Sequence, residues 1–164
     1  MRILFMGTPD IAAACLEALY AAGHEICAVY TRRDKPVGRK QVLTAPPVKT
    51  VALAHGTPVF QPRTLRDGGE DENIRALAPE LIVVVAYGCI LPASVLQIPK
   101  HGCINLHVSL LPKYRGAAPI QRAIIDGERE TGVTIMYMAE GIDTGDMLAK
   151  ASCAIYPDDN FETL

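Results

Sequence analysis

Short apolar runs alternate with amphipathic segments along most of this chain. The runs at 2–6, 25–30 and 81–86 have the length and composition of buried strands. The run at 81–86 is apolar on both faces, as a central parallel strand requires. The segments at 9–23 and 48–55 have the apolar spacing of helices. This alternation predicts an α/β fold with an open, doubly wound, mostly parallel sheet.

The rest of the chain continues the alternation with shorter elements, joined by a turn-rich segment at 139–146. The further predicted elements are short strands at 59–60 and 103–107, helices at 69–77 and 117–126, a short helix ending before Pro99, strands at 133–138 and 147–155, and the start of a helix at 160–164.

The segment from 31 to 47 has no apolar periodicity and contains Pro36, Gly38, Pro46 and Pro47, so it predicts a long mobile loop. Basic residues gather here: six cations and one anion lie between 31 and 50, a local charge of +5. Such a cluster is either a solvated surface or a site for phosphate backbones. Its charged residues are Arg32, Arg33, Asp34, Lys35, Arg39, Lys40 and Lys49.

Polar residues follow several predicted strands at the edge where such sheets bind ligands, the carboxyl ends of the strands. Gly7 and the segment 86–88 lie there, together with Asn105 and His107. Asn105 and His107 are two residues apart on a strand, so their side chains share a face. They are either a polar strand end satisfied by the backbone or part of an active site.

Two short motifs resemble known signatures but lack essential parts. G-T-P-D at 7–10 has neither the later glycines of a dinucleotide site nor the lysine of a P-loop. It predicts a turn, with Thr8 capping the following helix. D-T-G at 143–145 occurs once, whereas aspartic proteases need two such carboxylates. Asp143 is therefore either a turn residue or a loop carboxylate directed at His107.

Composition places the chain among globular proteins and adds few constraints. It has 164 residues, which fits one domain, 49% hydrophobic and 21% charged residues, and a net charge of -2. Its five cysteines show no C-x-x-C spacing, so neither a disulfide framework nor a zinc site is predicted. The apolar run at the start is too short for a signal peptide, which favours a reducing, cytosolic compartment. The residues alone predict an α/β enzyme with histidine chemistry, acting on nucleic acid.

Two long motifs resemble the formyltetrahydrofolate-dependent formyltransferases. They are I-N-L-H-V-S-L-L-P-K-Y-R-G-A-A-P-I-Q-R-A-I from Ile104 and E-T-G-V-T-I-M-Y-M-A-E-G-I-D-T-G-D-M-L from Glu130. F-M-G-T-P-D, V-F-Q-P and V-V-A-Y-G-C-I-L-P are similar to the members that act on an aminoacyl-tRNA. The resemblance covers nearly the whole chain and implies a Rossmann-like formyltransferase fold.

The resemblance also implies roles for particular residues. It implies transfer of a formyl group from the co-substrate 10-formyltetrahydrofolate to initiator methionyl-tRNA, without a metal. It also implies a monomeric, cytoplasmic (or organellar) protein that does not bind membranes. The implied catalytic residues are Asn105, His107 and Asp143; the tetrahydrofolate site is Ser109, Leu110, Leu111 and Pro112, with Tyr87, Gly88, Ile90 and Leu91 lining the pterin pocket; and the tRNA-binding residues are Arg32, Arg33, Lys35, Arg39 and Lys40.

The chain departs from the family pattern in two respects. Val108 stands where relatives have a small residue or proline, so we expect a narrowed or shifted folate loop. Family chains also continue into a linker and a C-terminal β-barrel that helps bind tRNA. Residues 1–164 are therefore expected to be the N-terminal catalytic domain of a truncated chain. The alternatives are a relative that formylates glycinamide ribonucleotide or an amino-sugar nucleotide, or that hydrolyses formyltetrahydrofolate, and a non-catalytic folate- or RNA-binding module.

Overall fold

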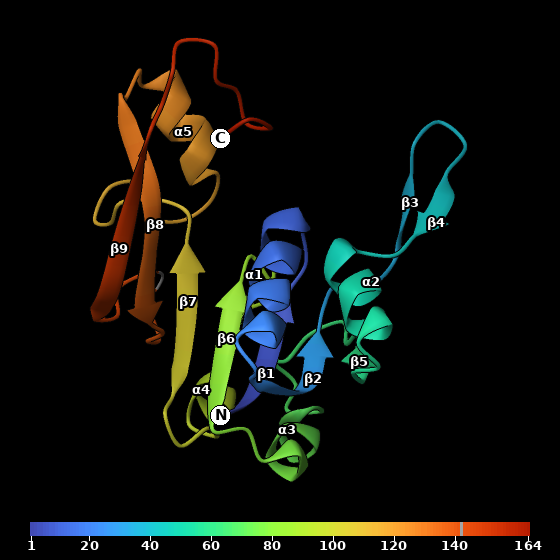
Figure 1. Ribbon diagram of the computed structural model, residues 1–164. Helices are drawn as coiled ribbons and strands as arrows, with labels where there is room; N and C mark the ends of the chain where they lie inside the picture. The colour runs from blue at the N-terminus through green and yellow to red at the C-terminus, as the bar shows by residue number, and fades with distance from the viewer. Residues whose placement is uncertain (142) are drawn as a thin grey trace. The chain divides into compact units, whose positions relative to one another are not determined.

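Four parallel strands form the sheet of the first part of the chain. The computed structural model describes residues 1–141 and 143–164 and divides into unit 1, Met1–Ile104, and unit 2, Asn105–Leu164 (Figure 1). Within unit 1 the strands lie in the order β5-β2-β1-β6, and each neighbouring pair is parallel, as predicted. Their bounds are β1 Arg2–Gly7, β2 Glu25–Tyr30, β5 Val59–Phe60 and β6 Leu81–Val85.

The core of unit 1 lies on β1 and the elements packed against it. Leu4, Phe5 and Met6 of β1 are fully buried, which fits a central strand covered on both faces. Helix α1, Asp10–Ala21, contacts β1, β2 and β6 and buries Leu16. Because Gly7 of β1 pairs with Val85 of β6, the ends of these two strands reach the same edge of the sheet.

The predicted cap of α1 is wrong. Pro9 occupies the N-cap position and no side chain caps this end of the helix. The Thr8 hydroxyl donates instead to the Tyr87 carbonyl at 3.0 Å. The Tyr87 carbonyl lies beyond the end of β6, so this hydrogen bond connects the turn after β1 to the loop after β6. The other helices of unit 1 are α2 Pro47–Ala54, α3 Asp71–Leu77 and α4 Ala93–Leu96, close to their predicted positions.

The prediction of a structureless loop from 31 to 47 is also wrong. β3, Lys35–Val37, and β4, Val42–Thr44, pair as an antiparallel hairpin that projects from the rest of unit 1 (Figure 1). Gly38 begins the turn with a φ of +73°, which glycine adopts without strain. All six strand residues are exposed. The hairpin was missed because neither of its faces is buried, so no alternation of apolar and polar residues marks it.

An antiparallel pair of long strands dominates unit 2. β8, Glu130–Tyr137, pairs with β9, Met147–Ala154, from Glu130 opposite Ala154 to Met136 opposite Met147. β7, Cys103–His107, contains the division between the units and has its predicted bounds, and α5 covers Pro119–Ile125. β8 begins three residues before the predicted strand, and Ile142 of the predicted turn-rich segment lies outside the described residues.

The predicted helix start at 160–164 is a single turn. Leu164 N–H donates to the Asn160 carbonyl at 3.2 Å, and the Asn160 side chain accepts the N–H of Glu162 at 2.8 Å. One backbone hydrogen bond closes a turn but does not propagate a helix. Among the described residues, no helix has both the length and the apolar character needed to cross a bilayer.

Candidate functional site

The side chains of His107 and Asp143 lie together in unit 2. His107 ends β7 and is 7% exposed, and its Nδ1 is 3.6 Å from Asp143 Oδ2. The same carboxylate oxygen accepts the Gly116 N–H at 2.7 Å. Asp143 has a φ of +50°, a left-handed backbone that aspartate tolerates better than most residues. The loop carboxylate is thus directed at His107, one of the two arrangements that the sequence left open.

The other ring nitrogen of His107, Nε2, also contacts an acceptor oxygen. Nε2 lies 2.8 Å from the Tyr114 carbonyl oxygen, which can only accept. Nε2 can therefore donate a hydrogen bond to this carbonyl, while Nδ1 faces the Asp143 carboxylate at a distance longer than a hydrogen bond. Asn105 lies two residues earlier on β7 and is half-buried. The strand therefore carries an amide donor beside an imidazole whose orientation is set from both sides.

The turn at Ser109–Pro112 is held by a hydroxyl from β8. Thr134 is fully buried; its hydroxyl donates to the Ser109 carbonyl at 2.7 Å and accepts the Leu111 N–H at 3.1 Å. Ser109 is also fully buried and donates its hydroxyl to the Lys113 carbonyl at 2.7 Å. The Leu111–Pro112 peptide bond is cis. The Ser109 side chain therefore shapes the turn from inside, while Leu110 and Pro112 lie nearer the surface.

Sequence reasoning missed the residues that support this site. Thr134 bridges two turn residues, Lys150 of β9 donates to the Leu111 carbonyl, and Gly116 orients Asp143. A threonine and a lysine within the apolar strands 133–138 and 147–155 were the available signal. Their partners are 23 to 39 residues away in sequence, so only the fold identifies them. Val108 is half-buried beside the turn.

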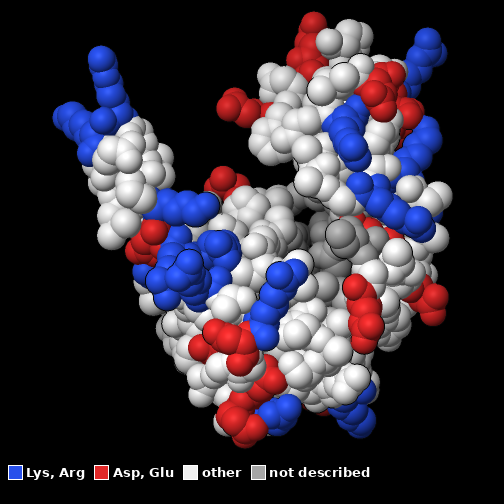
Figure 2. Space-filling view, turned by 180° about the vertical axis from the view of Figure 1, so that it is seen from behind, with Lys and Arg blue, Asp and Glu red and all other residues white. Residues whose placement is uncertain are grey.

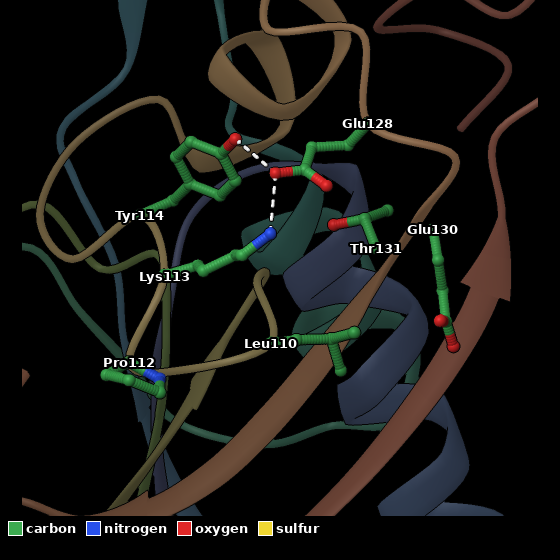
Figure 3. Close-up of a pocket in the computed structure, with 7 residues that line it drawn as sticks. All are labelled: Leu110, Pro112, Lys113, Tyr114, Glu128, Glu130 and Thr131. Carbon is green, nitrogen blue, oxygen red and sulfur yellow. Dashed lines mark hydrogen bonds and ion pairs between the residues drawn. The ribbon is translucent and has the colours of Figure 1, made fainter.

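A cavity of about 290 Å³ adjoins the turn (Figure 3). Lys113 and Tyr114 point toward Glu128 within it: Lys113 Nζ lies 2.7 Å and the Tyr114 hydroxyl 3.0 Å from Glu128 Oε1. The hydrogen bond from Lys113, and to a lesser extent that from Tyr114, lowers the pKa of Glu128. The turn thus opens onto a charged cavity. Its lining residues are Leu110, Pro112, Lys113, Tyr114, Glu128, Glu130 and Thr131.

The segment predicted to line a pterin pocket belongs to unit 1 and follows β6. Its side chains are of two kinds: Tyr87 is 2% and Leu91 is 7% exposed, whereas Ile90 is 59% exposed. Gly88 has a φ of +79°, and Ala86 before Tyr87 has a φ of +45°. The chain bends at Ala86, and Ile90 follows with an exposed apolar side chain.

The predicted tRNA-binding residues divide into two groups within unit 1. Lys and Arg side chains gather at the tip of the projecting hairpin and again at its base (Figure 2). Arg39 and Lys40 lie exposed in the hairpin turn and Lys35 is exposed on β3, whereas Arg32 is half-buried and Arg33 donates to the Gln61 carbonyl at 3.2 Å. The remaining cation of the cluster, Lys49, is paired with Asp34 at 2.9 Å.

The described ranges 1–141 and 143–164 contain no cluster of three or more His, Cys, Asp or Glu side chains suited to holding a metal ion. The polar groups at the site are instead an amide, an imidazole and a carboxylate, which are hydrogen-bonding and proton-transferring groups.

Comparisons with known proteins give a consistent result. The chain is 58% identical over 155 residues to the methionyl-tRNA formyltransferase of Alkaliphilus oremlandii, covering 94% of this chain and 50% of that protein. It is 56% identical over 164 residues to the methionyl-tRNA formyltransferase of Halalkalibacterium halodurans, covering 100% of this chain and 52% of that protein. The chain therefore spans about half the length of the curated relatives that it matches.

Solved structures confirm the predicted fold class. A phosphoribosylglycinamide formyltransferase from Bacillus halodurans superposes with a TM-score of 0.82 at 22% identity, covering 99% of this chain and 84% of that chain. A formyltetrahydrofolate deformylase from Pseudomonas syringae gives 0.77 at 19% identity, covering 98% and 53%. Identities this low establish the Rossmann-like fold alone. The sequence also matches the family described as Formyl transferase over residues 1–164, and the chain therefore belongs to the formyl transferase family.

Proposed function

We propose that the protein containing this chain transfers the formyl group of 10-formyltetrahydrofolate to the α-amino group of methionyl-tRNA. Three relatives that match along the whole chain at 55–56% identity are named methionyl-tRNA formyltransferases. In this proposal, residues 1–164 are the N-terminal catalytic domain of a longer, cytoplasmic, monomeric enzyme.

The observation that carries the proposal is the contact between His107 Nδ1 and Asp143 Oδ2, which are 3.6 Å apart. His107 lies on β7, the strand that also bears Asn105. When the amine attacks the formyl carbon, negative charge develops on the formyl oxygen. An amide N–H from Asn105 and an N–H from His107 are suited to stabilising it. Each such donor contributes about 3 kcal/mol of transition-state stabilisation.

In this proposal Asp143 has two roles, one toward the imidazole of His107 and one toward the attacking amine. Its carboxylate stabilises the positive charge of a protonated imidazole by its proximity. It also provides a basic group for the proton that the attacking amine loses. In this scheme the Nε2 N–H of His107 exchanges the Tyr114 carbonyl for the formyl oxygen when substrate binds. The exchange keeps the N–H paired throughout.

Two further surfaces hold the substrates in this proposal. The turn Ser109–Pro112 and the segment Tyr87–Leu91 bind tetrahydrofolate, and the exposed Ile90 side chain offers the second of these an apolar contact. The hairpin cations, Lys35, Arg39 and Lys40, contact tRNA phosphates, supported by their exposure.

A single substitution tests the catalytic assignment. In the full-length protein, His107→Ala is expected to lower kcat for formyl transfer by about a hundredfold or more while folate binding persists, because one hydrogen-bond donor to the oxyanion is removed. Initial rates with 10-formyltetrahydrofolate and charged initiator tRNA measure this. His101→Ala, at an exposed histidine, is the control and should match wild type. A kcat for His107→Ala within a few-fold of wild type would contradict the assignment of His107 as a catalytic residue.

The acceptor is tested separately with the wild-type protein. Methionyl-tRNA, glycinamide ribonucleotide and an amino-sugar nucleotide are offered in turn with the same formyl donor. Product with methionyl-tRNA alone supports the proposal. Formylation of a small-molecule acceptor, or folate binding without turnover, would instead identify one of the alternative functions.

A further inference from the structure

Cys89 lies in a setting unlike that of the other cysteines. Burial raises the pKa of the thiols of Cys15 and Cys27, and raises that of Cys103 to about 12. Cys153 is exposed on β9. Cys89 is half-buried in the loop after β6, and within the described residues it is the cysteine whose sulfur has a hydrogen-bond contact with a cationic side chain.

The guanidinium group of Arg32 faces the sulfur of Cys89. Arg32 Nη1 lies 2.6 Å from Cys89 Sγ, and the same nitrogen donates to the Arg63 carbonyl at 3.4 Å. The Arg32 Cδ atom also lies against Gly88, 3.8 Å from where a Cβ would stand. The guanidinium is therefore anchored over the loop. A cation held beside a sulfur stabilises the thiolate, which is the nucleophilic form of cysteine.

The hydroxyl of Tyr87 is a second sign that charge can form on this sulfur. Tyr87 is 2% exposed, and its hydroxyl lacks a hydrogen-bond partner within 1–141 and 143–164. Burial raises the pKa of Tyr87, and the charge of the nearby Cys89 sulfur raises it further. A buried donor without an acceptor is unfavourable. Negative charge on Cys89 would give it an acceptor.

We propose that Cys89 is a reactive thiol that forms a mixed disulfide with small anionic disulfides. The Cys89 thiolate attacks one sulfur of the disulfide, a new S–S bond forms, the original S–S bond breaks, and the other half leaves as a thiolate that takes a proton from water. The Cys89 sulfur is oxidised and the departing sulfur is reduced. Arg32, whose guanidinium faces the sulfur, stabilises the attacking thiolate and attracts the carboxylates of the reagent.

The modification has a functional consequence that rests on the proposed function. Cys89 lies between Gly88 and Ile90 in the segment that we assign to the pterin of the folate. A substituent on its sulfur would occupy space beside the exposed Ile90 side chain. Mixed-disulfide formation would then reversibly block folate binding, and a reducing thiol would restore it.

Peptide-resolved labelling tests the reactivity. The full-length protein is treated with dithiobis(nitrobenzoate), an anionic disulfide, and digested with trypsin. Peptide 76–100 contains Cys89 as its single cysteine, and peptide 101–113 contains Cys103. Cys89 is expected to react faster than Cys103. Arg32→Met is expected to slow Cys89 by about three- to tenfold, because the variant lacks the cation that lies 2.6 Å from the attacking sulfur.

Matched variants isolate the effect of the Arg32 charge on the Cys89 thiol. Arg33→Met removes a neighbouring exposed cation and should leave the rate of Cys89 within about twofold of wild type. Arg32→Lys keeps a cation and should also retain most of the rate, which covers the case in which Arg32→Met fails to fold. Cys89 reacting as slowly as Cys103, or reacting equally fast with methionine at position 32 in a folded protein, would overturn the proposal.

A protection experiment separates this inference from the proposed function. Tetrahydrofolate is expected to slow labelling of Cys89 but not of Cys153. Fast, Arg32-dependent labelling without protection keeps the reactive thiol and overturns the pterin-pocket assignment. Labelling that is neither fast nor Arg32-dependent overturns the reactive thiol and leaves the catalytic assignment to its own test.

Discussion

The hydroxyl of Thr134 satisfies two backbone groups of the Ser109–Pro112 turn at once. It donates to the Ser109 carbonyl and accepts from the Leu111 N–H, inside a fully buried environment. Buried backbone groups are costly to leave unpaired. One side chain on β8 thus shapes the turn that we assign to the folate.

Thr134→Val keeps the side-chain volume but removes both hydrogen bonds. The free energy of unfolding is expected to fall by about 1–3 kcal/mol. KM for the folate should rise more than kcat falls, because the turn positions the substrate and takes no part in the chemistry. Urea unfolding and steady-state kinetics measure the two effects. Thr50→Val, at an exposed position on α2, is the control, and equal behaviour of the two variants would contradict this role.

At the scale of elements, a small polar network anchors the β3–β4 hairpin. Asp34, directly before β3, accepts from Lys49 of α2 at 2.9 Å and from Gln61, just after β5, at 2.8 Å. The Gln61 amide also donates to the Arg32 carbonyl at 2.8 Å. The hairpin strands themselves are three residues each and exposed, so these contacts at its base determine its position in unit 1.

This network predicts a pH dependence of stability. The hydrogen bonds from Gln61 and then Lys49 hold the pKa of Asp34 below its ordinary value. A lowered folded-state pKa contributes stability above the ordinary pKa and loses it as the pH falls through the folded-state pKa. Wild type should therefore lose more unfolding free energy than Asp34→Asn between about pH 5 and about pH 2.

Denaturant titrations at the two pH values measure this difference. Glu72→Gln changes an exposed acid on α3, in an (i, i+3) pair with Arg75, and serves as the control. Its loss of stability on acidification should match that of wild type. Identical acid sensitivity of Asp34→Asn and wild type would show that Asp34 gains nothing from its partners on folding.

At the scale of the whole molecule, the distribution of charge matters more than the net charge of -2. The hairpin turn carries Arg39 and Lys40, both exposed, while Lys49 is neutralised by Asp34. A projecting element with exposed cations at its tip suits a phosphate backbone, because the association releases bound counterions.

The double variant Arg39→Ala/Lys40→Ala is expected to weaken tRNA binding by the full-length protein. The slope of log K against log salt concentration should become shallower by about 1–2, near 0.9 for each phosphate that the variant no longer neutralises. Filter binding over a series of salt concentrations measures it. Lys100→Ala, at an exposed lysine outside the hairpin, should leave the slope unchanged, and an unchanged slope in the double variant would contradict phosphate contacts at the hairpin turn.

The alternation of apolar runs and amphipathic segments was enough to predict the α/β class, the parallel strands of unit 1 and the bounds of β2 and β7. Burial explains this success, since a strand covered on both faces must be apolar throughout. The same reasoning failed for the hairpin, because its exposed strands carry no burial pattern. It failed for Thr8 as well, because the hydroxyl donates to the carbonyl of Tyr87, which is 79 residues away and cannot be identified from the local sequence.

The sequence by itself determined the residue types available for chemistry: Asn105 and His107 on one face of a strand, a loop carboxylate at Asp143, and a cluster of cations. Only the tertiary structure decided that Asp143 meets His107, that Thr134 and Lys150 hold the turn, that Lys49 is paired and that Arg32 faces Cys89. The physical reason is distance along the chain. Periodicity reports whether a residue is buried, whereas a hydrogen bond between residues far apart in sequence exists only after the chain has folded.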